Sequence, residues 1–220
     1  TVGKLVDYVE RRGLAEDTLF VFVVDNGWQP GTRRFPNSPG QFHHTKRSKR
    51  APFDYGLRTP ILIRWDGRVR PATHEGLASS VDIAPTVLAA AGLADHARDL
   101  PGINLLPSAT GKKPLDPERA VFGEVYPGDA TSLGNPSRDV AYRWVRKGRW
   151  KLIVPHAQGN KKPWGGYLDS PALFDVVSDP DESTNRIDHP VNVGKAAELL
   201  HHLDQWWTPR DDSAVPKPVR

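Results

Sequence analysis

The chain has 220 residues, 38% hydrophobic and 25% charged, and its 30 Lys and Arg against 26 Asp and Glu give a net charge of +4. This length can bury a substantial core, and no apolar run approaches the roughly 20 residues that cross a bilayer. The absence of cysteine excludes disulfides, zinc–thiolate sites and a cysteine nucleophile within this chain. Because the net charge is small, any preference for anions must come from local clusters.

The first segment is predicted to be a helix. Val2, Leu5, Val6 and Val9 recur at helical spacing, and Gly13 is a natural end for the helix. A helix that leads into a buried strand is half of a βαβ unit, whose first strand would have to precede residue 1. We therefore expect an amino-terminal portion of the protein to lie outside this chain.

The next segment, Thr18 to Val24, carries no charge and consists mainly of β-branched and aromatic residues. This pattern predicts a strand buried on both faces, as in a parallel sheet. Asp25, Asn26 and Gly27 follow at its carboxyl end, where open α/β sheets place their ligands. Two adjacent oxygen donors suggest a hard cation such as Ca²⁺ or Mg²⁺. The same three residues are also typical of a simple turn.

A long loop from 28 to 52 separates this strand from a second one at 60–65. The loop contains His43, His44 and a basic run from Lys46 to Arg50. Loops of this length are usually functional or disordered, and the basic run alone could be a solvated patch or a nucleic-acid contact. Since the loop joins two core strands, it is expected to lie over the same crevice as Asp25 and Asn26.

The remaining chain changes character after a helix predicted at 82–91. Residues 100–119 are rich in Pro and Gly and are expected to be a linker. Short strands are expected at 120–126, 140–146, 149–154 and 173–177, with a Lys147-Gly148 hairpin, followed by a helix over 192–207. Adjacent antiparallel strands with one helix indicate a small α+β subdomain. The tail after Thr208 is expected to be disordered.

Several motifs in register resemble the carboxyl-terminal half of the sulfatases of the alkaline phosphatase superfamily. They are Asp17 to Gly27, Ser48 to Pro60, Ser79 to Leu88, Gly148 to Ile153, and Leu173 to Asp175 followed by Asp179 to Glu182. The resemblance implies an α/β fold that is part of an alkaline-phosphatase-like α/β/α sandwich with a small carboxyl-terminal antiparallel α+β subdomain. The expected parts are 1–115 in the catalytic domain, 116–207 in the small subdomain and 208–220 in a flexible tail.

The resemblance also assigns roles. It implies that Asp25 and Asn26 are two ligands of an active-site Ca²⁺, with Mg²⁺ as another candidate, and that Lys49 contacts the sulfate as a catalytic residue. A cation and an ammonium would supply the positive charge that a sulfate ester needs. His43 and His44 could reach the substrate from the loop.

Two departures from the family pattern stand out. Asp54 and Tyr55 replace the usual Glu and first Gly of the segment after Lys49; Tyr55 requires a backbone without positive φ. The nucleophile, a formylglycine made from Cys or Ser in a Cys/Ser-x-Pro-x-Arg motif, is absent. Residues 134–138 mimic that motif with Gly134 in the nucleophile's place, and glycine has no side chain to oxidise. We therefore expect this chain to be inactive alone.

The leading hypothesis is the carboxyl-terminal part of a sulfatase that acts on a sulfated small molecule or glycan, in the periplasm or secreted, without nucleic-acid or membrane partners. One alternative within the superfamily is a phosphate or phosphonate ester hydrolase. Another is a non-catalytic module that binds an anionic glycan or nucleic acid through its basic loop; its binding would depend steeply on salt and not on a metal. The sequence does not determine the oligomeric state.

Overall fold

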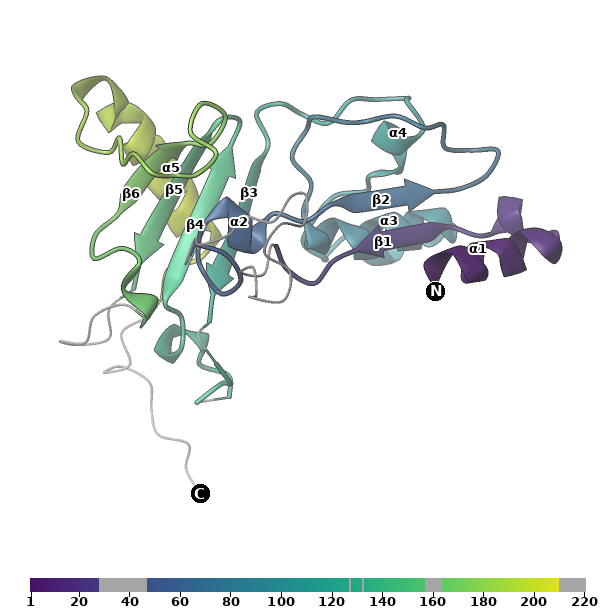
Figure 1. The fold of residues 1–220 in the computed structure, drawn as a ribbon, viewed down its shortest axis with the longest axis horizontal. Coiled ribbons are helices and arrows are strands. Elements are labelled where there is room, and N and C mark those ends of the chain that lie inside the picture. Colours follow the sequence, from purple (N-terminus) through teal and green to yellow (C-terminus); the bar gives the residue numbers. More distant parts are fainter. Residues whose placement is uncertain (28–46, 127, 132, 157–163, 210–220) are drawn as a thin grey trace, which may run out of the picture. The chain divides into compact units, whose positions relative to one another are not determined.

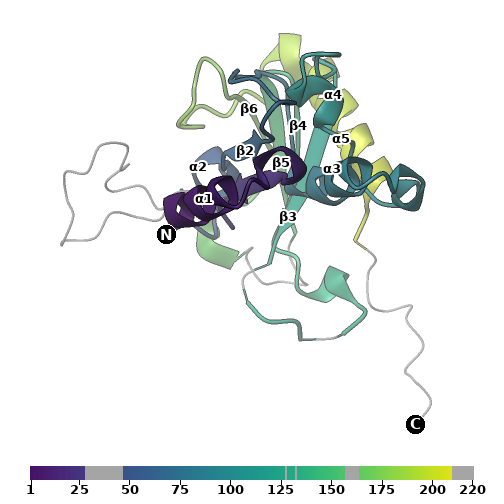
Figure 2. The same cartoon turned by 90° about the vertical axis from the view of Figure 1, so that its right-hand side faces the viewer.

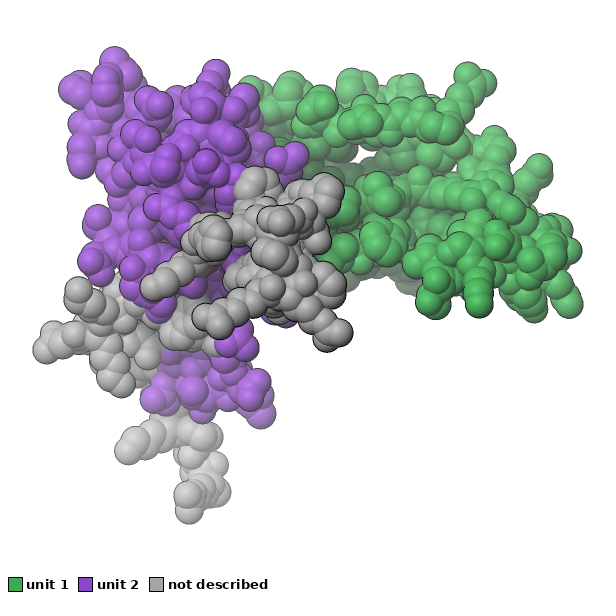
Figure 3. Space-filling model, viewed as in Figure 1, with its two compact units in different colours: residues 1–25, 59–119 green, residues 26–58, 120–220 purple. Residues whose placement is uncertain are grey.

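The computed structural model describes residues 1–27, 47–126, 128–131, 133–156 and 164–209. They form two compact units (Figure 3): unit 1 contains Thr1–Asp25 and Thr59–Arg119, and unit 2 contains Asn26–Arg58 and Ala120–Arg220. Short 3-10 helices lie at Ala15–Asp17, Ser80–Asp82, Ala94–Ala97, Pro136–Arg138, Trp164–Gly166 and Pro190–Asn192. No helix among the described ranges is both long and apolar enough to cross a membrane.

Unit 1 contains a two-stranded sheet of β1 (Phe20–Val23) and β2 (Ile61–Arg64) (Figure 1). The strands are antiparallel, with Val21 opposite Ile63. The expectation of a parallel strand buried on both faces was therefore wrong for the described residues: Phe22 is 42% exposed and its cross-strand partner Leu62 is 57% exposed. An uncharged run in the sequence indicates an apolar strand, but it does not indicate which strand pairs with it or in which direction.

The helices of unit 1 are α1 (Val2–Arg11), α3 (Ile83–Ala90) and α4 (Leu106–Ala109). The helix α1 forms where the apolar spacing predicts it, and Gly13 beyond its end has φ +66°, which suits glycine. Arg64 of β2 donates to Glu10 of α1 at 2.6 Å. None of the residues of α1 is buried.

Residues 100–119, expected as a linker, instead contain α4 and pack within unit 1. Their last residue, Arg119, donates to both carboxylate oxygens of the fully buried Asp82 at 2.8 and 2.6 Å. Asp82 also accepts from the backbone N–H groups of Ser79 and Ile103. Pro and Gly content indicated irregular backbone correctly, but this long-range ion pair holds the segment in place.

Unit 2 is built on an antiparallel sheet in the order β3-β4-β5-β6. Its strands are β3 (Ala120–Val125), β4 (Tyr142–Lys147), β5 (Trp150–Pro155) and β6 (Ala172–Asp175), and its helices are α2 (Asp54–Leu57) and α5 (Val193–Trp206). The β4–β5 hairpin turns at Gly148, whose φ is +54°, so the predicted hairpin is confirmed. The expected strands and the helix agree with the structure to within two residues.

Both faces of this sheet are covered, as Figure 2 shows, with α5 on one side and α2 on the other. Because side chains alternate along a strand, Val145 and Leu152 pack against α5, whereas Ile153 packs against the segment that precedes α2. Phe53 of that segment is 1% exposed, with its ring centroid 6.0 Å from that of Phe174. The sheet therefore holds the segment that carries Lys49.

The assignment of 1–115 to a catalytic domain and 116–207 to a small subdomain stays a prediction. The expected tail at 208–220 lies outside the described residues from 210 onward.

Candidate functional site

Lys49 projects from a segment that is anchored on both sides. Ser48 is 2% exposed and Ala51 is fully buried, while Lys49 and Arg50 between them are exposed. The N–H of Ala51 donates to the carbonyl of Ser48 at 2.8 Å and closes a tight turn around Lys49. The ammonium is thus presented to solvent from a backbone that is fastened to the core of unit 2.

The backbone at Arg50 is strained. Its φ is +75°, a left-handed conformation that is uncommon for a residue with a Cβ and costs about 1–2 kcal/mol. Strain of this kind persists where surrounding contacts over-determine the backbone, and such residues cluster at functional sites. The strained residue lies directly beside Lys49.

Arg47, at the start of the described part of the basic run, is an anchor and not part of a solvated patch. Its guanidinium lies 4.3 Å from the centroid of the Phe53 ring and donates to the backbone carbonyls of Asp181, at 3.0 Å, and Glu182. In the described part of the basic run, Arg47 therefore makes inward contacts, whereas the side chains of Lys49 and Arg50 are exposed.

Asn26 is connected to the segment that carries Lys49 through backbone contacts of its neighbour Gly27. The N–H of Gly27 donates to the carbonyl of Gly56 in α2 at 3.0 Å, and a Cβ on Gly56 would lie 2.4 Å from the carbonyl oxygen of Ser48. Three backbone segments of unit 2 therefore meet without room for side chains, and this contact brings the neighbours of Asn26 and Lys49 together. Asp25 is exposed and belongs to unit 1.

Gly27→Ala is expected to disrupt this contact. A Cβ there would lie 2.3 Å from the carbonyl oxygen of Tyr55 and 2.7 Å from the carbonyl carbon of Gly56, and these backbone atoms cannot rotate away. We expect the free energy of unfolding, measured in urea, to fall by about 1–3 kcal/mol. Gly194→Ala in α5 is the control, because its Cβ would meet nothing within 4 Å. Equal stabilities for the two variants would contradict this account of Gly27.

The chemistry of Asp25 and Asn26 fits a hard cation, since both offer oxygen ligands. Ca²⁺ takes six to eight oxygens and Mg²⁺ six, so these two side chains can be only part of a coordination sphere. In the ranges that the structure describes, no group of three or more His, Cys, Asp or Glu side chains is placed to hold a metal ion. The predicted loop residues His43 and His44 lie outside the described residues.

Four charged side chains that the sequence did not single out form a largely buried group in unit 2. They are Asp54, Arg146, Lys151 and Glu182, and we call them the charge cluster. Lys151 and Glu182 are fully buried, and the Asp54 side chain is 15% exposed. Lys151 lies 2.8 Å from Asp54 and 3.0 Å from Glu182, and Arg146 lies 2.9 Å from Asp54. The available signal was the position of Lys151 in an apolar strand, on the face opposite to α5.

The cluster shifts the titration of its acids in opposite directions. Burial acts to raise the pKa of Asp54, but the charges of Lys151 and Arg146 outweigh it and hold that pKa below its usual value. Burial raises the pKa of Glu182, and the nearby Lys151 offsets only part of that effect. Asp54 is therefore the better-compensated carboxylate of the two.

Tyr55, which replaces the usual glycine, does not have the positive φ that would strain its backbone. It lies within α2 and is not among the described non-glycine residues with positive φ. Its hydroxyl donates to Asp181 at 2.5 Å, and burial together with this bond raises the pKa of Tyr55 to about 12. The substitution therefore adds a contact to the turn at 179–182.

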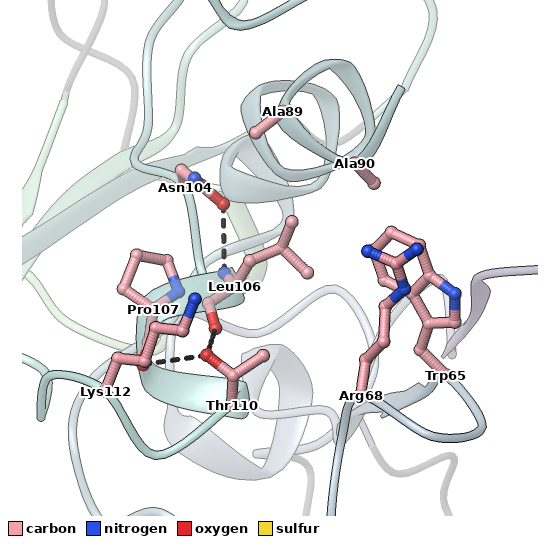
Figure 4. Close-up of a pocket in the computed structure, with 9 residues that line it drawn as sticks. All are labelled: Trp65, Arg68, Ala89, Ala90, Asn104, Leu106, Pro107, Thr110 and Lys112. Carbon is pink, nitrogen blue, oxygen red and sulfur yellow. Dashed lines mark hydrogen bonds between the residues drawn. The ribbon is translucent and has the colours of Figure 1, made fainter. Parts of the chain in front are cut away.

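A hollow of about 510 Å³ in unit 1 is separate from these residues (Figure 4). It is lined by Trp65, Arg68, Ala89, Ala90, Asn104, Leu106, Pro107, Thr110 and Lys112. The guanidinium of Arg68 stacks 4.4 Å from the centroid of Trp65. None of its lining residues carries a carboxylate, and none of the predicted site residues lines it.

Comparisons with known proteins find similarity to sulfatases. A family model described as Sulfatase matches residues 1–93. Arylsulfatase A from Bos taurus is 31% identical over 93% of this chain, and the match covers 40% of that protein. The chain thus spans about two fifths of the length of this curated relative.

Two solved structures share the fold. One is of a protein in complex with its substrate D-glucosamine-2-N,6-O-disulfate, with a TM-score of 0.66 and 22% identity over 93% of this chain and 37% of that one. The other is a phosphonate monoester hydrolase from Silicibacter pomeroyi, with a TM-score of 0.64 and 20% identity over 93% of this chain and 37% of that one. These likenesses confirm the expected α/β fold.

Proposed function

Because this chain belongs to the sulfatase family, we propose that it is the carboxyl-terminal part of a sulfuric ester hydrolase whose formylglycine nucleophile lies outside residues 1–220. The observation that carries the proposal is Lys49: an exposed ammonium on an anchored, strained turn that contacts Gly56 of α2, to which the N–H of Gly27 also donates. This arrangement suits a fixed positive charge for an anionic substrate group.

The chain's own residues would contribute charge and orientation. The Lys49 ammonium would donate hydrogen bonds to a sulfate oxygen and stabilise negative charge as the sulfur–oxygen bond to the alcohol breaks. Asp25 and Asn26 would supply two oxygen ligands to a divalent cation, Ca²⁺ or Mg²⁺, which when bound adds positive charge at the sulfate. Attack by the formylglycine hydrate would require residues that this chain does not contain.

The surface of unit 1 supports the proposal that further chain completes the domain. Phe22 and Leu62 of the two-stranded sheet and Val24, directly after β1, are at least 40% exposed, as are Val2 and Leu5 of α1. Exposed apolar residues on a sheet of only two strands are typical of a surface that other elements cover. The coverage of Bos taurus arylsulfatase A, at 40% of its length, agrees with this view.

The substrate class that we propose is a sulfated small molecule or glycan, handled in the periplasm or after secretion. The relative bound to D-glucosamine-2-N,6-O-disulfate is consistent with this choice. The likeness to a phosphonate monoester hydrolase keeps a phosphate or phosphonate ester as the second candidate, because one fold serves both kinds of ester. The inward contacts of Arg47 disfavour a spread basic surface for nucleic acid.

The test is the reading frame that precedes the codon of Thr1. We expect it to encode Cys/Ser-x-Pro-x-Arg close to an Asp-Asp pair, and the joined protein to hydrolyse a sulfated aryl ester in the presence of Ca²⁺. The 220-residue chain alone should be inactive in the same assay. A plain Thr or Ser nucleophile upstream would favour the phosphate or phosphonate ester. A reading frame without any nucleophile would overturn the enzyme proposal.

A further inference from the structure

We infer that the charge cluster (Asp54, Arg146, Lys151 and Glu182) positions the Lys49 turn relative to Asn26, so that residues of the small antiparallel sheet act as positioning residues for the proposed sulfate site. The role of Lys49 in this inference rests on the proposed function. The geometric part concerns only contacts within unit 2.

The cluster reaches α2 at its first residue. Both carboxylate oxygens of Asp54 are occupied, Oδ1 by Lys151 of β5 at 2.8 Å and Oδ2 by Arg146 of β4 at 2.9 Å. Arg146 and Lys151 are cross-strand partners in the β4–β5 register, so two adjacent strands bind the same carboxylate. The sheet thus fixes where α2 begins.

Glu182, in the turn at 179–182, contacts both ends of the segment from Arg47 to Asp54. The side chain of Glu182 accepts from the N–H of Asp54, and its backbone carbonyl accepts from Arg47. The segment from Arg47 to Asp54 is therefore clamped at both ends by one residue, which itself has a left-handed φ of +51°. Lys151 lies 3.0 Å from Glu182 Oε1 and so joins the clamp to the sheet.

Backbone contacts carry this placement to the proposed ligands. The carbonyl of Gly56 in α2 accepts from Gly27, next to Asn26, and Gly56 lies against the carbonyl of Ser48, next to Lys49. A shift of α2 would therefore move both neighbours. Well-packed apolar residues often stabilise a fold as well as a buried ionic cluster does, so stability alone does not explain these buried charges. Placement of α2 explains them better.

The test compares two double variants of the 220-residue chain. Lys151→Met with Glu182→Gln removes the Lys151 contacts with Asp54 and Glu182 and leaves the net charge unchanged. Lys147→Met with Glu198→Gln is the matched control, since that pair joins β4 to α5 at 2.9 Å, on the face of the sheet that α5 covers. Amide hydrogen exchange is measured at Gly27, Ala51 and Gly56, with the β4–β5 amides as an internal reference for the fold.

The expected result is exchange at least about 10-fold faster at those three amides in the first variant, with unchanged β4–β5 amides, and no difference in the control. Equal exchange in both variants would overturn the inference. If the β4–β5 amides also exchange faster, the same amides are compared in the single isosteric variant Glu182→Gln. Faster exchange at Gly27, Ala51 and Gly56 with unchanged β4–β5 amides would then support the inference, and unchanged exchange at all of them would overturn it.

Inorganic sulfate, followed by the NMR signals of the Lys49 side chain, separates the two proposals. We expect the first variant to bind sulfate about 10- to 100-fold more weakly at a temperature where both variants are folded, because small displacements of a positioned group are costly. A purely structural role would leave this affinity unchanged and would overturn the inference. If the unmodified chain shows no sulfate response at Lys49, the sulfate-binding role proposed for Lys49 fails, while the exchange data still decide the geometry.

Discussion

Lys49→Ala in the protein that includes the preceding chain is expected to lower kcat for sulfate-ester hydrolysis by about 100- to 1,000-fold. Lys49 is exposed on an anchored turn, so its removal deletes a charge at the proposed sulfate site and leaves no cavity. The free energy of unfolding should therefore stay within about 0.5 kcal/mol of the unmodified protein.

Two further variants sharpen this test. Lys49→Arg keeps the charge but replaces a compact ammonium by a planar fork, so we expect only partial recovery of kcat. Lys113→Ala removes another exposed lysine, in unit 1, and should leave kcat unchanged. If Lys49→Ala retained full activity, the role that the family resemblance assigns to this residue would be wrong.

Lys151→Met is expected to cost about 3–5 kcal/mol in the free energy of unfolding, because it leaves buried carboxylates without their shared cation. Lys151 and Glu182 are both fully buried, and Arg146 remains to compensate only Asp54. The measurement is urea unfolding of the 220-residue chain at neutral pH. Lys147→Met, which breaks a partly exposed ion pair with Glu198, should cost less than about 1 kcal/mol.

The pH dependence of this loss has a definite sign. In the unmodified chain the pKa of Asp54 is lowered, so its stabilising contribution is present above about 3.8 and is lost as the pH falls through the lower folded value. Without Lys151 the carboxylates bind protons more readily in the folded state. The difference between Lys151→Met and the unmodified chain should therefore shrink as the pH falls from 7 toward 4. A difference independent of pH would show that lost packing, and not unpaired charge, causes the destabilisation.

Adding Glu182→Gln to Lys151→Met should recover part of the lost stability, because it removes the buried carboxylate that Arg146 does not compensate. Recovery in the double variant would identify the coupling between these residues, which lie 3.0 Å apart. Additive losses would contradict it.

The sequence alone predicted most of the local structure. Apolar spacing placed α1 and α5, short strand-like segments placed the strands of unit 2, and Lys147-Gly148 placed the β4–β5 turn. These signals are local, since helical and strand periods and glycine turns depend on neighbouring residues. The motifs also pointed to the sulfatases, and a family model described as Sulfatase matches residues 1–93.

Only the tertiary structure decided the direction of β1–β2 pairing, the incorporation of residues 100–119 into unit 1 and the charge cluster behind Lys49. The cluster joins Asp54, Lys151 and Glu182, which are far apart along the chain. Each of the three is an ordinary charged residue in its own segment, and no local pattern states which distant charge will be buried with it. Chain folding brings them into a dry environment, where mutual compensation becomes necessary and geometry becomes specific.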